Sequence, residues 1–226
     1  MSLLRALITA VIVSTLLAAD ANAVNITTQD VTARQSTTWS QASWIWPNSY
    51  SQTSKDAPIG VVVLRRTFQP LIVLPLVNLK IAITADNAYY LYVNGKLAGS
   101  GLDWTSPGGW TVNNVTGNVP IAVAIVAVNY GEPTNMQTGE RGPAGVLATF
   151  TFTGNNGFDT YEYVTDGSWR GAWFIPDGSA SSATPNFIDP SYIDSGTPWA
   201  GATVIGAYGI GPWGTLPEPT ASSLQS

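Results

Sequence analysis

The sequence predicts an all-β protein, and three observations indicate it. Apolar and polar residues alternate with a period of two in Leu79–Thr84 and Tyr89–Val93, the pattern of strands with one buried face. The pair Asn94-Gly95 follows the second run and favours a two-residue hairpin turn, because both residues tolerate positive φ. No segment shows a helical repeat or a heptad. We therefore expect Ala88–Val93 to pair antiparallel with Lys96–Gly99.

Taken in chain order, the first segment, Met1–Ala23, has the pattern of a secretory signal peptide. It carries Arg5 early, then an apolar run, and ends in small residues at Ala21-Asn22-Ala23. An uncleaved membrane anchor is the alternative, but the apolar run is shorter than the ~20 residues that cross a bilayer. We expect a secreted, extracellular protein that begins near Val24, is either free or associated with a cell wall, and has no membrane contact after cleavage.

The rest of the chain predicts a single domain. Residues 24–43 are expected to form an N-terminal arm or edge strand, residues 44–216 one β-sandwich domain and residues 217–226 a disordered tail. Ile121–Val128 is apolar at every position, which predicts a central strand covered on both faces. In Val146–Thr153 the residues Val146, Ala148, Phe150 and Phe152 should point inward. Further strands are expected at Ile59–Phe68, Tyr161–Val164 and Gly201–Tyr208.

Composition excludes several classes of function. Only 10% of the 226 residues are charged and the net charge is −5, so the basic surface that nucleic acids require is absent. The sequence has no cysteine and no histidine, which excludes disulfides, Ser-His-Asp and Cys-His nucleophiles, and zinc sites of thiolate or imidazole ligands. A surface of uncharged polar residues with nine tryptophans and nine tyrosines suits neutral, hydroxyl-rich partners.

A series of short motifs in one order gives a resemblance to a known family. The motifs are Ala42-Ser43-Trp44-Ile45-Trp46, Arg65-Arg66-Thr67-Phe68, Thr84-Ala85-Asp86-Asn87, Tyr90-Leu91-Tyr92-Val93-Asn94-Gly95-Lys96, Asp103-Trp104, Gly142-Pro143-Ala144-Gly145, Thr165-Asp166-Gly167-Ser168-Trp169 and Pro212-Trp213-Gly214. Together they resemble the galactose-binding-like jelly-roll module beside the catalytic domains of α-L-rhamnosidases and some β-galactosidases. The resemblance implies a jelly-roll β-sandwich in which Trp44 and Trp46 pack the start of the fold.

Loops with aromatic and polar residues are the candidate binding sites. The tract Gly99–Trp110 is glycine-rich and carries Asp103, Trp104 and Trp110, and we expect it to form a sugar-contacting rim. Both tryptophans could instead fold back onto the sandwich. Asn129 and Tyr130 leave the central strand, and Arg141 lies in the polar segment Glu132–Gly145, which is either a second binding loop or a solvated crossover. Asp86-Asn87 is expected to bond local backbone amides.

Two further kinds of site follow from short patterns and from the resemblance. Asn25-Ile26-Thr27 and Asn114-Val115-Thr116 fit the N-glycosylation acceptor pattern, which makes Asn25 and Asn114 candidate glycosylation sites. No cofactor is expected. The resemblance implies that a structural calcium ion is possible, but no loop has a recognisable calcium spacing.

These observations predict a secreted, non-catalytic, lectin-like protein that binds neutral glycans or polysaccharides. The candidate contacts are Asp103, Trp104, Trp110, Asn129, Tyr130 and Arg141. A structural cell-wall protein without a specific ligand shares the same composition and is the alternative. A glycosidase or lyase is the third hypothesis, since hydrolysis needs two carboxyl groups about 5–10 Å apart and Asp103, Glu132, Glu140 and Asp166 are available.

Overall fold

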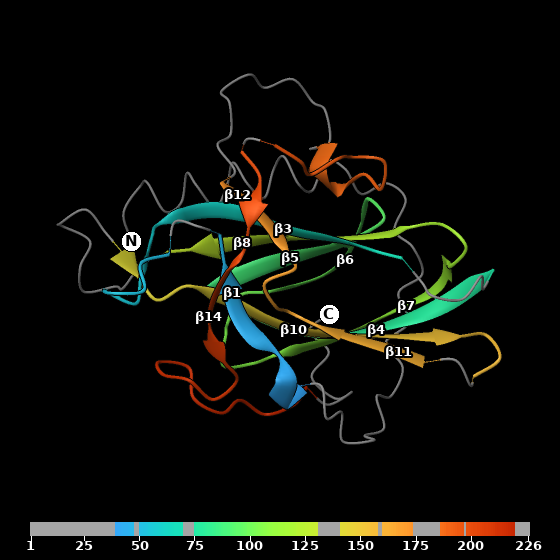
Figure 1. The fold of residues 1–226 in the computed structure, drawn as a ribbon. Helices are drawn as coiled ribbons and strands as arrows, with labels where there is room; N and C mark the ends of the chain where they lie inside the picture. Colours follow the sequence, from blue (N-terminus) through green and yellow to red (C-terminus); the bar gives the residue numbers. More distant parts are fainter. Residues whose placement is uncertain are drawn as a thin grey trace.

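Two antiparallel sheets form a sandwich in the computed structural model, which describes residues 39–47, 50–69, 75–130, 141–157, 160–173, 186–196 and 198–219. The first sheet has the order β14 (Thr203–Ala207), β1 (Ser43–Trp46), β10 (Gly145–Gly154), β4 (Leu76–Asp86), β7 (Gly108–Thr116), with β11 (Thr160–Val164) also paired to β10. The second has the order β13 (Ala200–Gly201), β12 (Arg170–Trp173), β3 (Gly60–Phe68), β8 (Ile121–Asn129), β5 (Ala88–Val93), β6 (Lys96–Gly101). Figure 1 shows the second sheet as a layer above the first.

The remaining described elements are short. β2 (Ala57–Pro58) pairs with β9 (Arg141–Gly142) beside the sandwich, and η1 (Trp39–Gln41) and η2 (Asn186–Ile188) are single 3-10 turns. No α-helix occurs in the described ranges, so the predicted all-β sandwich is confirmed. No helix in these ranges is long and apolar enough to cross a membrane. The predicted signal peptide, residues 1–23, and residues 24–38 of the predicted arm 24–43 lie outside the described residues.

The predicted hairpin is confirmed. β5 pairs with β6 from Val93 opposite Lys96 to Tyr89 opposite Gly101, two residues beyond the expected end of the pairing. Asn94 and Gly95 have φ of 48° and 81°, the left-handed conformations that a type I′ turn requires. The Asn94 side-chain oxygen also accepts a hydrogen bond from the backbone of β8, at 2.8 Å from the Ala122 nitrogen.

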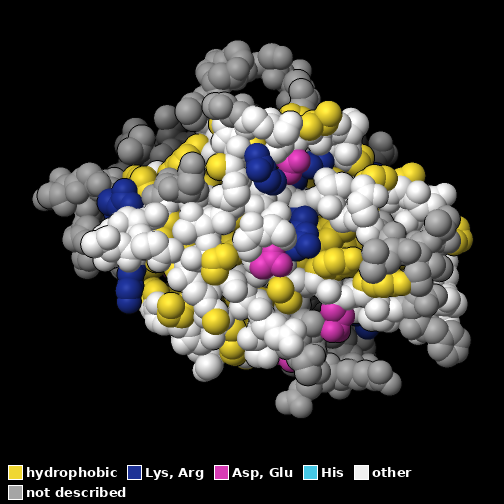
Figure 2. All heavy atoms as spheres, in the orientation of Figure 1, with side chains coloured by type: hydrophobic (Ala, Val, Ile, Leu, Met, Phe, Trp, Pro, Cys, Tyr) yellow, Lys and Arg dark blue, Asp and Glu magenta, His cyan; other side chains and the backbone are white. Residues whose placement is uncertain are grey.

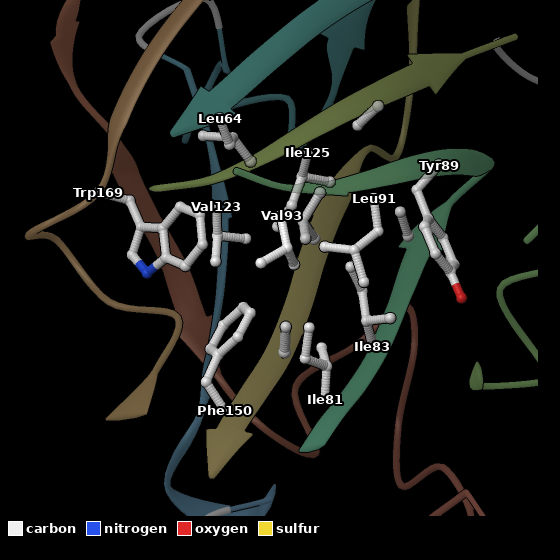
Figure 3. Packing of buried hydrophobic residues seen from close by; sticks show 14 of the residues in the cluster. Leu64, Ile81, Ile83, Tyr89, Leu91, Val93, Val123, Ile125, Phe150 and Trp169 are labelled. Atoms are coloured by element: carbon white, nitrogen blue, oxygen red, sulfur yellow. The ribbon is translucent and has the colours of Figure 1, made fainter. Parts of the chain in front are cut away.

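The core lies between the two sheets. The described strands contribute their inward-facing residues by strict alternation: Tyr89, Leu91 and Val93 from β5, Val123, Ile125 and Ala127 from β8, and Val146, Ala148, Phe150 and Phe152 from β10, as the sequence predicts. All nine residues of β8 are buried, which confirms a central strand covered on both faces. Figure 3 shows Leu64, Ile81, Ile83, Leu91, Ile125 and Phe150 converging from the two sheets.

The outer face of the second sheet is covered by residues 186–199. Phe187, Ile188 and Trp199 are buried against side chains of β3 and β8, which include Val63 and Val126. In Figure 1 this cover is the orange segment above the layer of β3, β8 and β5. It explains why both faces of β8 are apolar.

Part of the outer face of the first sheet is covered by residues 208–219. Trp213 stacks on Trp44 of β1, with ring centroids 4.1 Å apart and planes 19° from parallel. Leu216 is buried in the same cluster, and the Tyr208 hydroxyl donates to the Leu216 carbonyl at 2.7 Å. Trp44 and Trp46 are fully buried, which confirms their expected packing role. The second sheet and part of the first are therefore covered on the outside.

Candidate functional site

One end of the sandwich gathers the connections between the sheets. β4 ends at Asp86 and β5 begins at Ala88, so the chain crosses from one sheet to the other here. Gly145 of β10 lies opposite Asp86, and Asn129 of β8 lies opposite Gly60 of β3. The β6–β7 loop and the β2–β9 pair are at the same end. We call this region the Asp86 end.

The tryptophans that retain exposure all lie at the Asp86 end. Six of the nine are buried: Trp39, Trp44, Trp46, Trp169, Trp199 and Trp213. The other three, Trp104, Trp110 and Trp173, are partly exposed. Trp104 is in the β6–β7 loop, Trp110 lies in β7 against Gly99 and Gly108, and the Trp173 ring lies against Gly60. Aromatic surface is therefore concentrated at one end of the molecule.

Trp110 closes the edge of the sandwich between β7 and β6. Its indole nitrogen donates to the Tyr89 hydroxyl at 2.9 Å, and its ring lies so close to Gly99 that a Cβ there would overlap it. Burial raises the pKa of Tyr89 to about 12, although the hydrogen bond from Trp110 lowers it in part. Figure 3 shows the Tyr89 hydroxyl pointing away from the core. Trp110 thus packs on the core cluster and remains partly exposed.

Asp103 organises the β6–β7 loop. Its Oδ1 atom accepts hydrogen bonds from the backbone nitrogen of Thr105 at 2.9 Å and from the Thr105 hydroxyl at 2.7 Å, and Oδ2 accepts from the Ser106 hydroxyl at 3.2 Å. The Thr105 hydroxyl and amide are the main reason why the Asp103 pKa is lowered. On the other side of the loop, the Thr84 hydroxyl donates to the Trp104 carbonyl at 2.8 Å. The loop is therefore held in shape before any ligand arrives.

Asn129 and Asn87 bind backbone at the end of β8. The Asn129 side chain is 1% exposed and donates to the carbonyls of Ala57 and Pro58 at 3.0 and 3.1 Å. The Asn87 side-chain oxygen accepts from the Tyr130 nitrogen at 2.6 Å. The prediction that Asp86-Asn87 bonds local amides was wrong for Asn87, because its partner Tyr130 follows β8 and is a neighbour in space but not in sequence.

Asp86 and Arg141 complete the polar framework of this end. Asp86 accepts a hydrogen bond from the Trp213 indole nitrogen at 2.9 Å, which ties the C-terminal cover to the β4–β5 turn. Arg141 pairs with Asp56 at 2.5 Å between Nε and Oδ1 and donates from Nη2 to the Asp56 carbonyl at 3.2 Å. The Arg141 side chain is 37% exposed, so part of the guanidinium faces solvent.

The structure places the six predicted contacts at the Asp86 end, in two groups. Asp103, Trp104 and Trp110 belong to the β6–β7 edge, whereas Asn129, Tyr130 and Arg141 belong to β8 and the β2–β9 pair. β5 lies between β8 and β6, so these two strands are about 10 Å apart, two strand spacings. The sequence analysis did not single out Trp173. Its partial exposure depends on its contact with Gly60, and no pattern in the neighbouring sequence indicates that contact. The contacts with ligand stay a prediction.

Among the described residues, the candidate carboxylates for hydrolysis, Asp103 and Asp166, do not lie close together. Asp103 lies between β6 and β7 on one side of the sandwich, and Asp166 lies between β11 and β12 on the other side. Glu132 and Glu140 lie outside the described residues. Among the described residues no group of three or more Asp, Glu, His or Cys side chains could hold a metal ion, and we assign no calcium ligands.

Solved structures share this arrangement. The chain superposes on a lectin from Pleurotus ostreatus with a TM-score of 0.62 and 31% identity, over 80% of this chain and 46% of the lectin. The chain is a lectin-like β-sandwich module. The same lectin in complex with GalNAc matches equally well, with a TM-score of 0.62 over 80% of this chain. The module spans less than half the length of that lectin.

The module is also similar to portions of α-L-rhamnosidases, as the sequence motifs predict. A Streptomyces avermitilis α-L-rhamnosidase complexed with L-rhamnose superposes with a TM-score of 0.62 and 25% identity, over 80% of this chain and 16% of the enzyme. A Bacillus rhamnosidase shares the fold at 21% identity, with a TM-score of 0.52 over 19% of its length. No protein-family model matches the sequence, and no curated protein matches it.

Proposed function

We propose that this lectin-like module binds neutral glycans at the Asp86 end and does so without catalysis. The observation that carries the proposal is the distribution of tryptophan: six indoles are buried, and the three that keep exposure are all at this end. An indole costs free energy when it is left in water. Partly exposed rings gathered at one end therefore favour a surface that is covered by a ligand.

The charge of the surface supports a neutral ligand. Charged residues make up 10% of the chain, and Figure 2 shows a face on which uncharged side chains predominate and few charged ones occur. The ligands named with the similar structures, GalNAc and L-rhamnose, are neutral and rich in hydroxyl groups. Such sugars combine an apolar face of C–H groups, which packs on aromatic rings, with hydroxyls that donate and accept hydrogen bonds.

The residues of the Asp86 end divide into contacts and supports. Trp104 and Trp110 supply ring faces, and Asp103, Tyr130 and Arg141 supply polar groups to the sugar hydroxyls. Asn129 is buried and bonded to three carbonyls, so in this proposal it holds the frame in place rather than touching the sugar. The two groups lie on different strands of the same end, so one glycan would have to extend across β5 to contact both.

A glycan array probed with the purified chain tests this proposal, followed by titration of the best glycan. Trp104→Ala should weaken binding by about 10-fold or more, because loss of one stacking ring is worth at least ~1.4 kcal/mol. Trp104→Phe should restore part of the affinity. Ile193→Ala is the matched control, since Ile193 is 75% exposed and lies outside the Asp86 end; it should leave affinity unchanged.

Two results would overturn the proposal. One is undiminished binding by a folded Trp104→Ala protein, with folding checked by near-ultraviolet circular dichroism. The other is the absence of binding to every glycan together with retention in the insoluble wall fraction, which would favour the structural-protein alternative. Release of reducing sugar from a bound polysaccharide would contradict the non-catalytic part.

We propose further that the protein is exported, on the basis of the Met1–Ala23 pattern, and that Asn114 is available for glycosylation in a glycosylating host. Asn114 and Thr116 are exposed on β7, at the open edge of the first sheet. Asn25 lies outside the described residues. N-terminal sequencing of the protein from the culture medium tests export. A mass shift after enzymatic deglycosylation that Asn114→Gln abolishes tests the second point.

A further inference from the structure

Two neighbouring arginines on β3 have opposite environments. Arg65 is completely buried, and Nε, Nη1 and Nη2 all have partners in Phe187, Thr67, Asp189 and Asp194. The Arg66 side chain is 21% exposed and uses Nη1 alone, at 3.4 Å from the Val164 carbonyl and 3.5 Å from Asp166 Oδ1. All three side-chain nitrogens of Arg65 are used within the fold, whereas Arg66 keeps nitrogens that could donate to a ligand.

The unused groups around Arg66 are complementary. Within the described ranges, Nε and Nη2 of Arg66 have no hydrogen-bond partner, and Asp166 Oδ2 has none either. Asp166 is 44% exposed, and its Oδ1 is held by the Ser168 amide at 2.8 Å and by the Ser168 hydroxyl. Two donors and one acceptor therefore lie side by side at the surface in fixed positions.

Aromatic rings immobilise this pair. The Arg66 guanidinium carbon lies 5.0 Å from the centre of the Phe68 ring and 5.3 Å from that of Tyr163. Phe68 and Tyr163 are themselves 5.0 Å apart and belong to opposite sheets. A guanidinium that is already held by aromatic rings loses little conformational entropy when it binds a ligand.

We propose that Arg66, Asp166 and Tyr163 form a second binding site for neutral saccharides, distinct from the Asp86 end. An anionic ligand is disfavoured because Asp166 is 3.5 Å from the guanidinium. A pair of adjacent hydroxyls fits: one oxygen accepts from Arg66 and the other hydroxyl donates to Asp166. Arg66 is six residues along β3 from Gly60, about 20 Å from the Asp86 end at the rise of a strand. A single chain with two such sites can cross-link glycans.

Nuclear magnetic resonance of the ¹⁵N-labelled full chain, titrated separately with GalNAc, galactose and L-rhamnose, tests this inference. We expect at least one sugar to shift the Arg66 Nε–H signal and the amides of residues 163–168. These shifts should persist in Trp104→Ala. They should disappear in Arg66→Gln and weaken at least about 5-fold in Arg66→Lys, which keeps the charge but loses the fork. Lys96→Gln is the control for loss of one exposed positive charge.

The outcomes separate the two proposals. Shifts at the Arg66 site in the Trp104→Ala protein support the second site, even if the Asp86 end does not respond. Shifts confined to the Asp86 end overturn the second site and leave the proposed function standing. If Arg66→Gln retains the shifts of residues 163–168, or if no sugar moves them at millimolar concentration, the second site is overturned. Unchanged dispersion of the remaining amide signals verifies that each variant is folded.

Discussion

Tyr89 and Trp110 show how a single contact connects the core to the candidate site. Tyr89 points inward from β5 and is 2% exposed, as its place in the alternating run predicts. Its hydroxyl reaches the edge of the core and accepts the Trp110 indole proton at 2.9 Å. The orientation of a ring that we propose contacts sugar is thus set by a buried phenol.

Replacement of Tyr89 by phenylalanine should remove one part of the alkaline pH dependence of stability. Burial raises the pKa of Tyr89 to about 12, whereas an unfolded chain ionises near the ordinary value of 10.0. Because the Tyr89 pKa is higher in the folded protein, its contribution to stability is fully present at pH values below the pKa of the unfolded chain. It is lost as the pH rises toward the pKa of the folded protein. Wild-type stability should therefore fall between about pH 10 and 12, with a shallower fall in Tyr89→Phe. Urea unfolding at several pH values measures this.

The same substitution should cost about 1 kcal/mol at pH 7, because it leaves the Trp110 indole proton without its acceptor. Tyr163→Phe is a control in which another phenol is removed without loss of a described hydrogen bond. Identical slopes above pH 10 in the wild type and in Tyr89→Phe would show that this phenol ionises normally.

At the scale of single residues, the sequence predicts whether a side chain points inward better than it predicts which residue that side chain binds. Alternation correctly places Tyr89, Leu91 and Val93 inward, because it depends only on the period of a strand. It cannot predict that Asn87 binds Tyr130, since the two residues are brought together by the pairing of β5 with β8. Asn129 is a further example: its buried amide joins β8 to β2 and β9, and no local pattern indicates that.

At the scale of elements, the covers decide which surfaces remain accessible. The apolar run of β8 predicts that something covers its outer face, and residues 186–199 do so. The sequence does not identify this cover, because its residues form no strand or helix with a period of its own; only η2 is regular. Arg65 links it to β3 through the Phe187 and Asp189 carbonyls, and Arg170 links it through Asp194 and Trp199.

Replacement of Arg65 by methionine should detach this cover. The variant leaves two carbonyls and the Asp194 carboxylate without their cation, and we expect a loss of about 3 kcal/mol in the free energy of unfolding. Hydrogen exchange should speed up first at residues 186–199, while the amides of β4 and β10 in the first sheet stay protected. Arg66→Gln, next to it on the strand, should cost less than about 1 kcal/mol because its ion pair is partly exposed. Equal losses for the two variants would contradict the structural role of Arg65.

At the scale of the molecule, the residues that stabilise the fold and the residues that we propose bind glycans lie in different places. The second sheet and part of the first are covered on the outside, and the core fills the space between the sheets. The two proposed binding regions, the Asp86 end and the edge at Arg66, lie outside these covers. The composition and the alternation predict the sandwich, because they reflect burial summed over many residues. They do not predict which tryptophans stay exposed, because the exposure of Trp104, Trp110 and Trp173 depends on where loops and glycines place them.

Because the sequence contains no histidine, we expect the proposed glycan binding to be independent of pH over a wide range. No histidine can change charge between about pH 5 and 8, and Asp103, whose pKa is lowered from 3.8 mainly by the Thr105 hydroxyl and amide, stays ionised. Because its pKa is lowered in the folded protein, ionised Asp103 stabilises the folded loop at pH values above the ordinary Asp pKa. This stability is lost as the pH falls through the lowered pKa. The affinity for the best glycan should therefore be constant from about pH 5 to 8 and fall only at a pH below 3.8, the ordinary value of the Asp103 pKa. Asp103→Asn should bind more weakly at neutral pH and lose the acid-dependent fall. A change in affinity centred between about pH 6 and 7 would require a titrating contact that this site does not contain, and would place recognition elsewhere on the molecule.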